Sequence, residues 1–238
     1  PVSVRAEVSL TEEAGLSVDS PAIPIIGVMP TSRGLVMKCE LRNIGALILA
    51  DALNSYADEL IPCTVKVQDR FGNPVGVQTN ISFRAEAGNV VGAVSTTPFS
   101  SEAVGAGEGL GLATTLFSTF GTLPIETAPL TRNDPPEPYR RLETGRVVNP
   151  RDGLVTLIAF TQGEEWYFDT NGNGQYDEGE PFEDLTEPFV DANDNGVRDE
   201  GEAFVDLALE GADPDGIWNE PNGRWDGNTT IWTETRIV

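Results

Sequence analysis

A twelve-residue run with oxygen-bearing side chains at alternate positions occurs twice in the sequence, with its two copies 22 positions apart. The first copy spans 169–180 (DTNGNGQYDEGE) and the second spans 191–202 (DANDNGVRDEGE). Both satisfy the pattern D-x-[DN]-x-[DN]-G-x5-E, whose positions 1, 3, 5, 7, 9 and 12 surround one Ca²⁺ ion with oxygen. One match could be an ordinary Asx-rich turn, but two complete matches in tandem indicate calcium binding.

The spacing assigns a role to each residue of the two runs. Positions 1, 3, 5 and 9 offer side-chain oxygens, position 7 offers its backbone carbonyl, and the glutamate at position 12 binds through both oxygens. Gly174 and Gly196 occupy position 6, where a sharp turn favours a residue without a side chain. The predicted ligands are Asp169, Asn171, Asn173, Gln175, Asp177 and Glu180 in the first loop, and Asp191, Asn193, Asn195, Val197, Asp199 and Glu202 in the second.

The period of 22 residues continues from Asp191 to Asp213, and a Gly-x-aromatic-Asp/Asn sequence recurs at 174–177, 216–219 and 223–226. The sequence therefore predicts two calcium ions, with a third ion as a further candidate; a plain cluster of Asx turns is the alternative for the third. The candidate ligands of the third ion are Asp213, Asp215, Asn219 and Asp226, and further candidates for a neighbouring ion are Asp184, Asp206, Glu164 and Glu165.

The residues around the two loops do not predict the paired helices of an EF-hand. A strand-like run, 157–168, precedes the first loop, and Pro181 follows it where an exit helix would begin. The run 180–184 (EPFED) recurs as 202–206 (EAFVD), and neither continues with a helical apolar period. The loops thus resemble the helix-poor calcium repeats of dockerins and thrombospondin-type proteins. A sensor that opens a groove between helices is not expected.

The charge of the chain is concentrated around these loops. Residues 164–226 hold 20 Asp and Glu against two Arg, so this segment carries −18 of the net charge of −23. Bound divalent cations would relieve the repulsion within so acidic a segment. Nucleic acid and anionic membranes are not expected as partners, because both bind basic surfaces. No apolar stretch is long enough to predict membrane insertion.

The remaining residue types argue against catalysis. The chain has no histidine, which excludes Ser–His and Cys–His mechanisms and His-ligated metals. Most clustered carboxylates are already assigned to calcium, so we expect no enzyme. The two cysteines, Cys39 and Cys63, predict one disulfide, as in secreted proteins, with a pair of buried thiols as the alternative.

The elements that position the loops are predicted to be short strands. Runs of Val, Ile, Thr and Phe alternate with Gly, Pro and Asn, and only 44–55 suggests a helix. Residues 88–110 and the proline-rich excursion 121–153 are expected to be irregular. The predicted strands are Ser3–Leu10, Gly34–Leu41, Cys63–Asp69, Thr79–Ala87, Gly111–Phe117, Val155–Thr161 and Thr229–Val238. Such a series predicts an all-β sandwich.

The run 63–83 (CTVKVQDRFGNPVGVQTNISF), with 109–117 (GLGLATTLF), resembles the bacterial immunoglobulin-like domains of invasin/intimin-type surface proteins. The resemblance covers residues 60–120 and implies an extracellular, structural or adhesive module without catalysis. It suggests an Ig-like β-sandwich with an irregular calcium-binding loop appendage. The expected organisation is a sandwich over 1–163, an acidic calcium region over 164–228 and a terminal strand over 229–238.

The expected protein is thus a calcium-stabilised module of a bacterial cell surface. Strands at both ends of the chain could pair with neighbouring domains or with identical subunits of a filament. The alternative function is calcium-dependent carbohydrate binding, with Trp166, Tyr167, Trp218 and Trp225 as aromatic faces for a sugar. Solvent-facing rings would favour that alternative, whereas packed rings would favour a scaffold.

Overall fold

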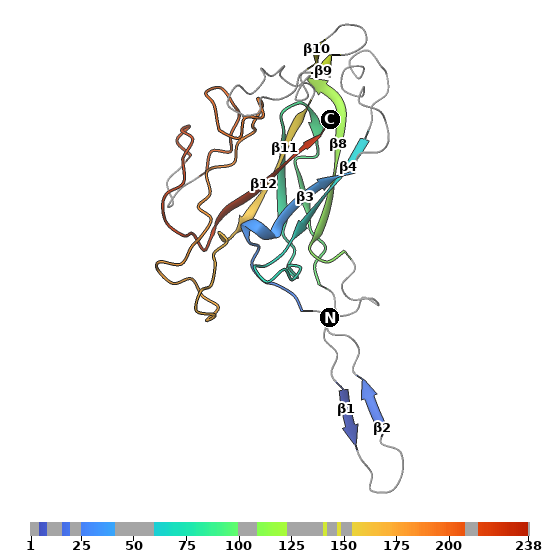
Figure 1. Cartoon of the computed structure of the whole chain (residues 1–238). Coiled ribbons are helices and arrows are strands. Elements are labelled where there is room, and N and C mark those ends of the chain that lie inside the picture. The colour runs from blue at the N-terminus through green and yellow to red at the C-terminus, as the bar shows by residue number, and fades with distance from the viewer. Residues whose placement is uncertain are drawn as a thin grey trace.

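Figure 1 shows a computed structural model of the chain. It describes residues 5–8, 16–19, 25–40, 60–99, 109–122, 140–141, 147–148, 154–207 and 214–237. Within these ranges the regular structure is almost entirely β, with a short 3₁₀ turn at Ser32–Gly34. No helix among the described residues is long and apolar enough to cross a membrane.

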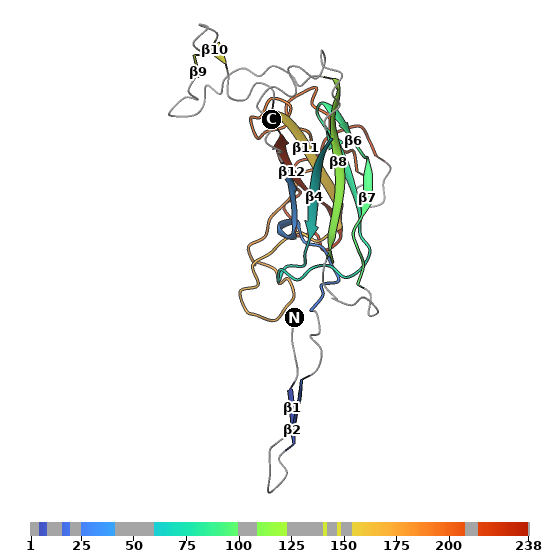
Figure 2. The same ribbon diagram turned by 90° about the vertical axis from the view of Figure 1, so that its right-hand side faces the viewer.

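Two four-stranded antiparallel sheets form the body of the protein, and their strands run roughly along its long axis (Figures 1 and 2). One sheet has the order β12 (Thr229–Ile237), β11 (Val155–Gly163), β5 (Asn80–Ala85) and β7 (Ala93–Ser95). The other has the order β3 (Leu35–Cys39), β4 (Leu60–Val67), β8 (Leu112–Thr122) and β6 (Gly88–Val90). The prediction of an all-β sandwich is confirmed.

Two small two-stranded sheets complete the described structure. β1 (Arg5–Val8) pairs with β2 (Leu16–Asp19), and β9 (Arg140–Arg141) pairs with β10 (Val147–Val148). The β1–β2 hairpin lies apart from the sandwich in both views (Figures 1 and 2).

Alternation of side chains builds the core between the two large sheets. In β4, Val65 and Val67 are fully buried while Lys66 is exposed, which is the alternation of a strand with one face on the core. β11 differs, because its first five residues are all buried, which means that both of its faces are covered. The core contains Leu35, Met37, Ile61, Cys63, Val65, Val67, Val75, Ile81, Phe83, Ala87, Ala113, Phe117, Val155, Leu157, Ala159, Ile231 and Ile237.

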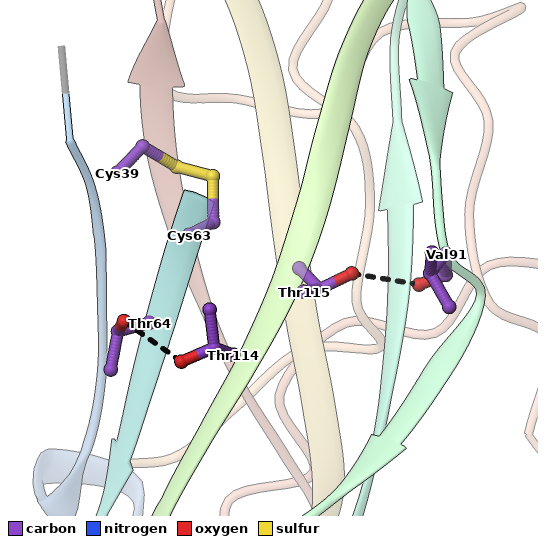
Figure 3. Close-up of a disulfide and its surroundings, with 6 residues drawn as sticks. All are labelled: Cys39, Cys63, Thr64, Val91, Thr114 and Thr115. Carbon is purple, nitrogen blue, oxygen red and sulfur yellow. Dashed lines mark hydrogen bonds between the residues drawn. A yellow bond between two sulfur atoms is a disulfide. The ribbon is translucent and has the colours of Figure 1, made fainter. Parts of the chain in front are cut away.

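The predicted disulfide between Cys39 and Cys63 is present (Figure 3). The two cysteines are directly opposed in β3 and β4, which are neighbours in one sheet. In antibody domains the conserved disulfide instead joins the two sheets. The bond in this protein fixes the register of β3 on β4, and the Thr64–Thr114 hydroxyl pair, 3.1 Å apart, links β4 to β8 beside it (Figure 3).

All seven predicted strands are present, with shifted ends. The expectation of a long loop over 88–110 is wrong at its start, because β6 and β7 lie there. Each has only three residues, so neither leaves an alternation long enough to detect. β6 pairs with β8 and β7 pairs with β5, so the chain passes from one sheet to the other between them. The predicted helix 44–55 and most of the excursion 121–153 lie outside the described residues.

Candidate metal centre

The acidic segment is inserted between β11 and β12, which are adjacent antiparallel strands. It lies along the outer face of their sheet, to the left in Figure 1. Ile158, buried on that face of β11, packs with Val190 and Val205 of the insertion. Since each valine immediately precedes an aspartate of the acidic region, this small apolar cluster attaches that region to the sandwich.

Each predicted calcium loop is closed at its base by a short antiparallel contact. Tyr167 pairs with Phe182 around the first loop, and Phe189 pairs with Phe204 around the second. Two backbone hydrogen bonds, each 2.8 Å long, close each loop. In the first loop, Phe168 N–H donates to the Pro181 carbonyl and Glu183 N–H donates to the Trp166 carbonyl. In the second loop, Val190 N–H donates to the Ala203 carbonyl and Val205 N–H donates to the Pro188 carbonyl. The loops are therefore closed turns, flanked by extended chain instead of helices.

Inside the first loop, the side chains at positions 1, 3, 5 and 9 all form hydrogen bonds with other residues of the loop. The Asp169 carboxylate accepts the amides of Asn173 at 3.2 Å and of Gly174 at 2.8 Å. The Nδ2 groups of Asn171 and Asn173 donate to one oxygen of Asp177, at 2.7 and 2.6 Å. Hydrogen bonds thus link the four predicted ligands within one loop.

The glutamate at position 12 closes the first loop. Glu180 is 6 % exposed, and its two oxygens accept the amides of Thr170 at 2.7 Å and of Asp177 at 3.1 Å. The Thr170 hydroxyl also donates to Oε1, at 2.9 Å. A carboxylate has about four lone-pair directions, so a cation bound by both oxygens would take the free direction of Oε2 and replace this hydroxyl on Oε1. Glu180 is oriented as the bidentate ligand of such a loop would be.

The second loop repeats these contacts. The Asp191 carboxylate accepts the amides of Asn195 at 3.0 Å and Gly196 at 2.7 Å. The Nδ2 groups of Asn193 and Asn195 donate to one oxygen of Asp199. The Glu202 carboxylate accepts the amides of Ala192 and Asp199, each at 2.9 Å. The same atoms at the same loop positions are therefore used twice.

The backbone turns in the same way in both loops. The position-6 glycines have φ of 86° at Gly174 and 78° at Gly196, the conformation that the pattern predicts there. Position 4 is also left-handed, with φ of 71° at Gly172 and 57° at Asp194. Among the described residues, Asp194 is the one non-glycine residue with a positive φ, a conformation that is costly for a residue with a side chain. The side chain of Asp194 accepts a hydrogen bond from Arg236 of β12.

Arg236 of β12 binds the second loop to the sandwich. Its guanidinium donates to Asp191 and to Asp194, each at 2.8 Å. Asp191 is fully buried, and the Thr156 hydroxyl of β11 donates to its carbonyl at 2.9 Å. The sequence does not predict this role for Arg236, because 42 residues or more separate it from its partners; its outward position on an alternating strand is the available signal.

Local contacts shift the pKa values of the acidic side chains in different directions. Burial acts to raise the pKa of Asp169, but the amides of Gly174, Gly172 and Asn173 outweigh it and hold that pKa below its ordinary value. Burial also opposes the amides of Asp177 and Thr170 at Glu180, whose pKa is lowered in the same way. At Glu165 burial dominates and raises the pKa to about 7.

The donor set suits a hard cation. Every side chain that converges in the two loops offers oxygen from a carboxylate or carboxamide, which is the chemistry of Ca²⁺ and not of Zn²⁺. Three or more Asp, Glu, His or Cys side chains do not converge on a common point within the described ranges. The hydrogen bonds explain this, since loop amides hold each carboxylate. Gln175 and Val197 would contribute carbonyls, and their amides already bond to the Asn173 and Asn195 side chains at 2.7 Å.

The residues predicted for a third ion fall into two sets of contacts. Asp215 bonds within its own turn, and Asn219 donates its amide to Glu187 at 3.0 Å. Asp226 instead donates its amide to Glu165 at 2.9 Å. Asp213 lies outside the described residues. Sequence reasoning missed Glu187, although its spacing of 22 residues from Glu165 is the repeat period.

The aromatic side chains of this region pack against the chain. Trp225 stacks on Tyr176 with ring centroids 4.7 Å apart and donates its Nε1 hydrogen to the Glu165 carbonyl at 2.7 Å. The Trp218 ring donates to the Glu187 carbonyl at 3.0 Å. The Arg33 guanidinium covers Trp166 at 3.5 Å from the ring centroid, and Tyr167 is 5 % exposed. Trp166, Trp218 and Trp225 are half-buried, and Tyr167 is buried.

Comparisons of the chain with protein-family models, curated proteins and solved structures found no match.

Proposed function

We propose that this chain is a calcium-stabilised, extracellular structural or adhesive module of a bacterial surface protein or filament. The observation that carries the proposal is the pair of loops at 169–180 and 191–202, which make the same internal contacts with the same all-oxygen donor set. Two loops that agree in sequence and in geometry favour a shared ligand over a coincidence of Asx turns.

The charge of the insertion supports a structural role for the ion. A segment with a net charge of −18 repels itself, and its apolar attachment to the sheet is small. Calcium that binds only the folded form stabilises that form by mass action. At the millimolar concentrations common outside cells, loops of this kind with Kd of about 10⁻⁴ to 10⁻³ M would be largely occupied.

Three features support the location and the architecture that we propose. The disulfide between Cys39 and Cys63 suits an oxidising compartment. The antiparallel sandwich and the run 63–83 fit an invasin/intimin-type Ig-like domain, although the disulfide lies within one sheet. β12, β7, β3 and β6 are the outer strands of the two large sheets, and such edges could pair with neighbouring domains or identical subunits.

Carbohydrate binding is the weaker alternative. It needs aromatic faces open to solvent, whereas Trp166, Trp218 and Trp225 are held by a guanidinium, backbone carbonyls and a neighbouring ring. These contacts favour the scaffold. We propose no enzymatic activity, because the chain lacks histidine and our proposal assigns most clustered carboxylates to calcium.

The function is tested by calcium titration calorimetry on the chain and on two single variants, Glu180→Gln and Glu202→Gln. Each variant removes the charge of one bidentate ligand, so each should lose one binding event while the other loop keeps its affinity. Glu178→Gln and Glu200→Gln are matched controls, since these exposed glutamates at position 10 carry the same charge and are not ligands. Unchanged stoichiometry in both ligand variants would refute the loop assignment.

A further inference from the structure

We propose that the chain forms two additional calcium sites, each assembled from three separate segments, so that the acidic region holds four ions. This inference rests on the proposed calcium function. The additional sites use carboxylates that lie outside the loops 169–180 and 191–202 and that are not ligands of either loop.

The first additional site, called site A, is built from Glu165, Asp184 and the turn 222–226. Asp184 accepts the amides of Asn222 at 3.1 Å and Gly223 at 2.6 Å, as Asp169 accepts those of positions 5 and 6 in the first loop. Asn222 donates its Nδ2 hydrogen to Asp226 at 2.7 Å, as Asn173 does to Asp177. Asp184 thus occupies position 1, although 38 residues separate it from position 5.

Glu165 takes the place of the position-12 glutamate in site A. Its two oxygens accept the amides of Leu185 at 2.8 Å and of Asp226 at 2.9 Å. Leu185 follows Asp184 as Thr170 follows Asp169, so these are the amides of positions 2 and 9 that Glu180 accepts in the first loop. Each backbone-amide hydrogen bond that joins positions 1, 2, 5, 6, 9 and 12 of the contiguous loop has a counterpart in site A, whereas the Thr170 hydroxyl bond has none because Leu185 stands at position 2.

The second additional site, called site B, is built in the same way from Glu187, Asp206 and the turn 215–219. Asp206 accepts the amide of Gly216 at 2.6 Å. Glu187 accepts the amides of Leu207 at 2.7 Å and of Asn219 at 3.0 Å. Glu187 and Asp206 lie 22 residues after Glu165 and Asp184, so site B repeats site A by one period.

An unpaired oxygen in site B points to a ligand outside the chain. Oδ1 of Asp206 is buried and has no hydrogen-bond partner, while Oδ2 of the same carboxylate faces the turn through Gly216. A buried carboxylate oxygen without a donor is costly and rare, and a bound cation is the partner that would satisfy it.

The buried glutamates of sites A and B are a further indication of bound cations. Glu165 is 2 % exposed and Glu187 is 4 % exposed, and neither forms an ion pair with a described arginine or lysine. Burying carboxylates without a compensating positive charge is strongly unfavourable. A divalent cation bound by both oxygens of each glutamate supplies that charge.

The sequence explains how two turns come to serve two sites. Residues 213–219 (DPDGIWN) and 220–226 (EPNGRWD) are adjacent copies of one seven-residue pattern, [DE]-P-[DN]-G-x-W-[DN]. Gly216 and Gly223 both have φ of 78°, equal to that of Gly196. The earlier copy serves the later repeat and the later copy serves the earlier repeat, so this segment runs back along the two loops. Calcium at sites A and B would fasten it there.

The test is the number of calcium ions bound to the intact chain at about 1 mM free calcium, measured by equilibrium dialysis and by native mass spectrometry. We expect four ions in the wild-type protein and three in each of Glu165→Gln and Glu187→Gln. Glu200→Gln, a matched change of an exposed glutamate outside every ligand set, should keep four. Circular dichroism verifies that each variant is folded.

The outcomes separate this inference from the proposed function. Two or three ions in the wild-type protein would overturn the four-site assignment while leaving the contiguous loops. Four ions that persist in both variants would also overturn it. No bound calcium would refute the calcium function itself. The wild-type count decides the matter even if a variant fails to fold.

Discussion

At the scale of single residues, the ion pairs and amide contacts of the carboxylates decide how the acidic region can exist without a large core. Asp191 is fully buried beside Arg236, whereas Glu165 is buried beside backbone amides and the carboxylates of Asp184 and Asp226. The first has a cation within the chain, and in our proposal the second receives one from outside. We therefore expect the two residues to respond differently to mutation.

Replacement of Arg236 by alanine should destabilise the protein by about 2 kcal/mol. The charge of Asp191 would remain buried without its partner, at a cost of about 3–5 kcal/mol for a fully enclosed pair, which the partial exposure of Arg236 reduces. Urea unfolding in chelator measures the change, with Lys66→Ala on the exposed face of β4 as the control. A loss below about 0.5 kcal/mol, the range of an ordinary surface change, would contradict the anchoring role of Arg236.

Stability of the calcium-free protein should fall as pH rises from about 4.5 to about 7. Burial raises the pKa of Glu165 to about 7, so within this window the folded protein binds a proton that the unfolded chain has released. The stabilisation is complete below the unfolded pKa and is lost as pH rises through the folded one. Melting in chelator across this range tests it. In Glu165→Gln the slope should become smaller, and an unchanged slope would exclude Glu165 as its source.

At the scale of elements, β11 connects the sandwich to the acidic region. Leu157 faces the core between the sheets, while the next residue, Ile158, faces Val190 and Val205 of the insertion. One strand therefore contributes to two apolar clusters. This explains why its burial departs from the alternation seen in β4.

The two faces of β11 can be separated by a matched pair of variants. Ile158→Ala and Leu157→Ala each remove a fully buried side chain and should each cost about 2–5 kcal/mol. Only Ile158→Ala should also weaken calcium binding, because Val190 and Val205 directly precede Asp191 and Asp206. Calorimetry of the folded variants measures this. Equal calcium affinity in the two variants would contradict the coupling of the sheet to the loops.

The sequence predicts the local parts of this structure and does not predict the contacts between residues far apart in the chain. Val65 and Val67 predict β4 by alternation, and the spacing of Asp169 and Glu180 predicts a closed loop. β6 and β7 are too short to leave a periodic signal. The contacts of Asp184 with Gly223 and of Arg236 with Asp191 join residues 39 and 45 positions apart, and no spacing rule reports such distant contacts.

At the scale of the whole molecule, the protein combines a disulfide-linked sandwich with a highly charged insertion on its outer face. The insertion begins and ends in adjacent strands, β11 and β12, so its two ends are fixed by the sheet. The disulfide supports one sheet. In our proposal, metal ions stabilise the acidic insertion that covers the other sheet. Rigidity outside the cell would then depend on calcium.

The most direct test of this account is thermal unfolding of the chain with millimolar calcium and with excess chelator, followed by near-ultraviolet circular dichroism of tryptophan. At tenfold excess over Kd, each ion contributes about 1.4 kcal/mol, so two occupied sites should raise Tm by roughly 6–12 °C, and four sites by more. Tryptophan order around Trp218 and Trp225 should decrease in chelator. An identical melt and spectrum in both conditions would contradict calcium as the structural ligand.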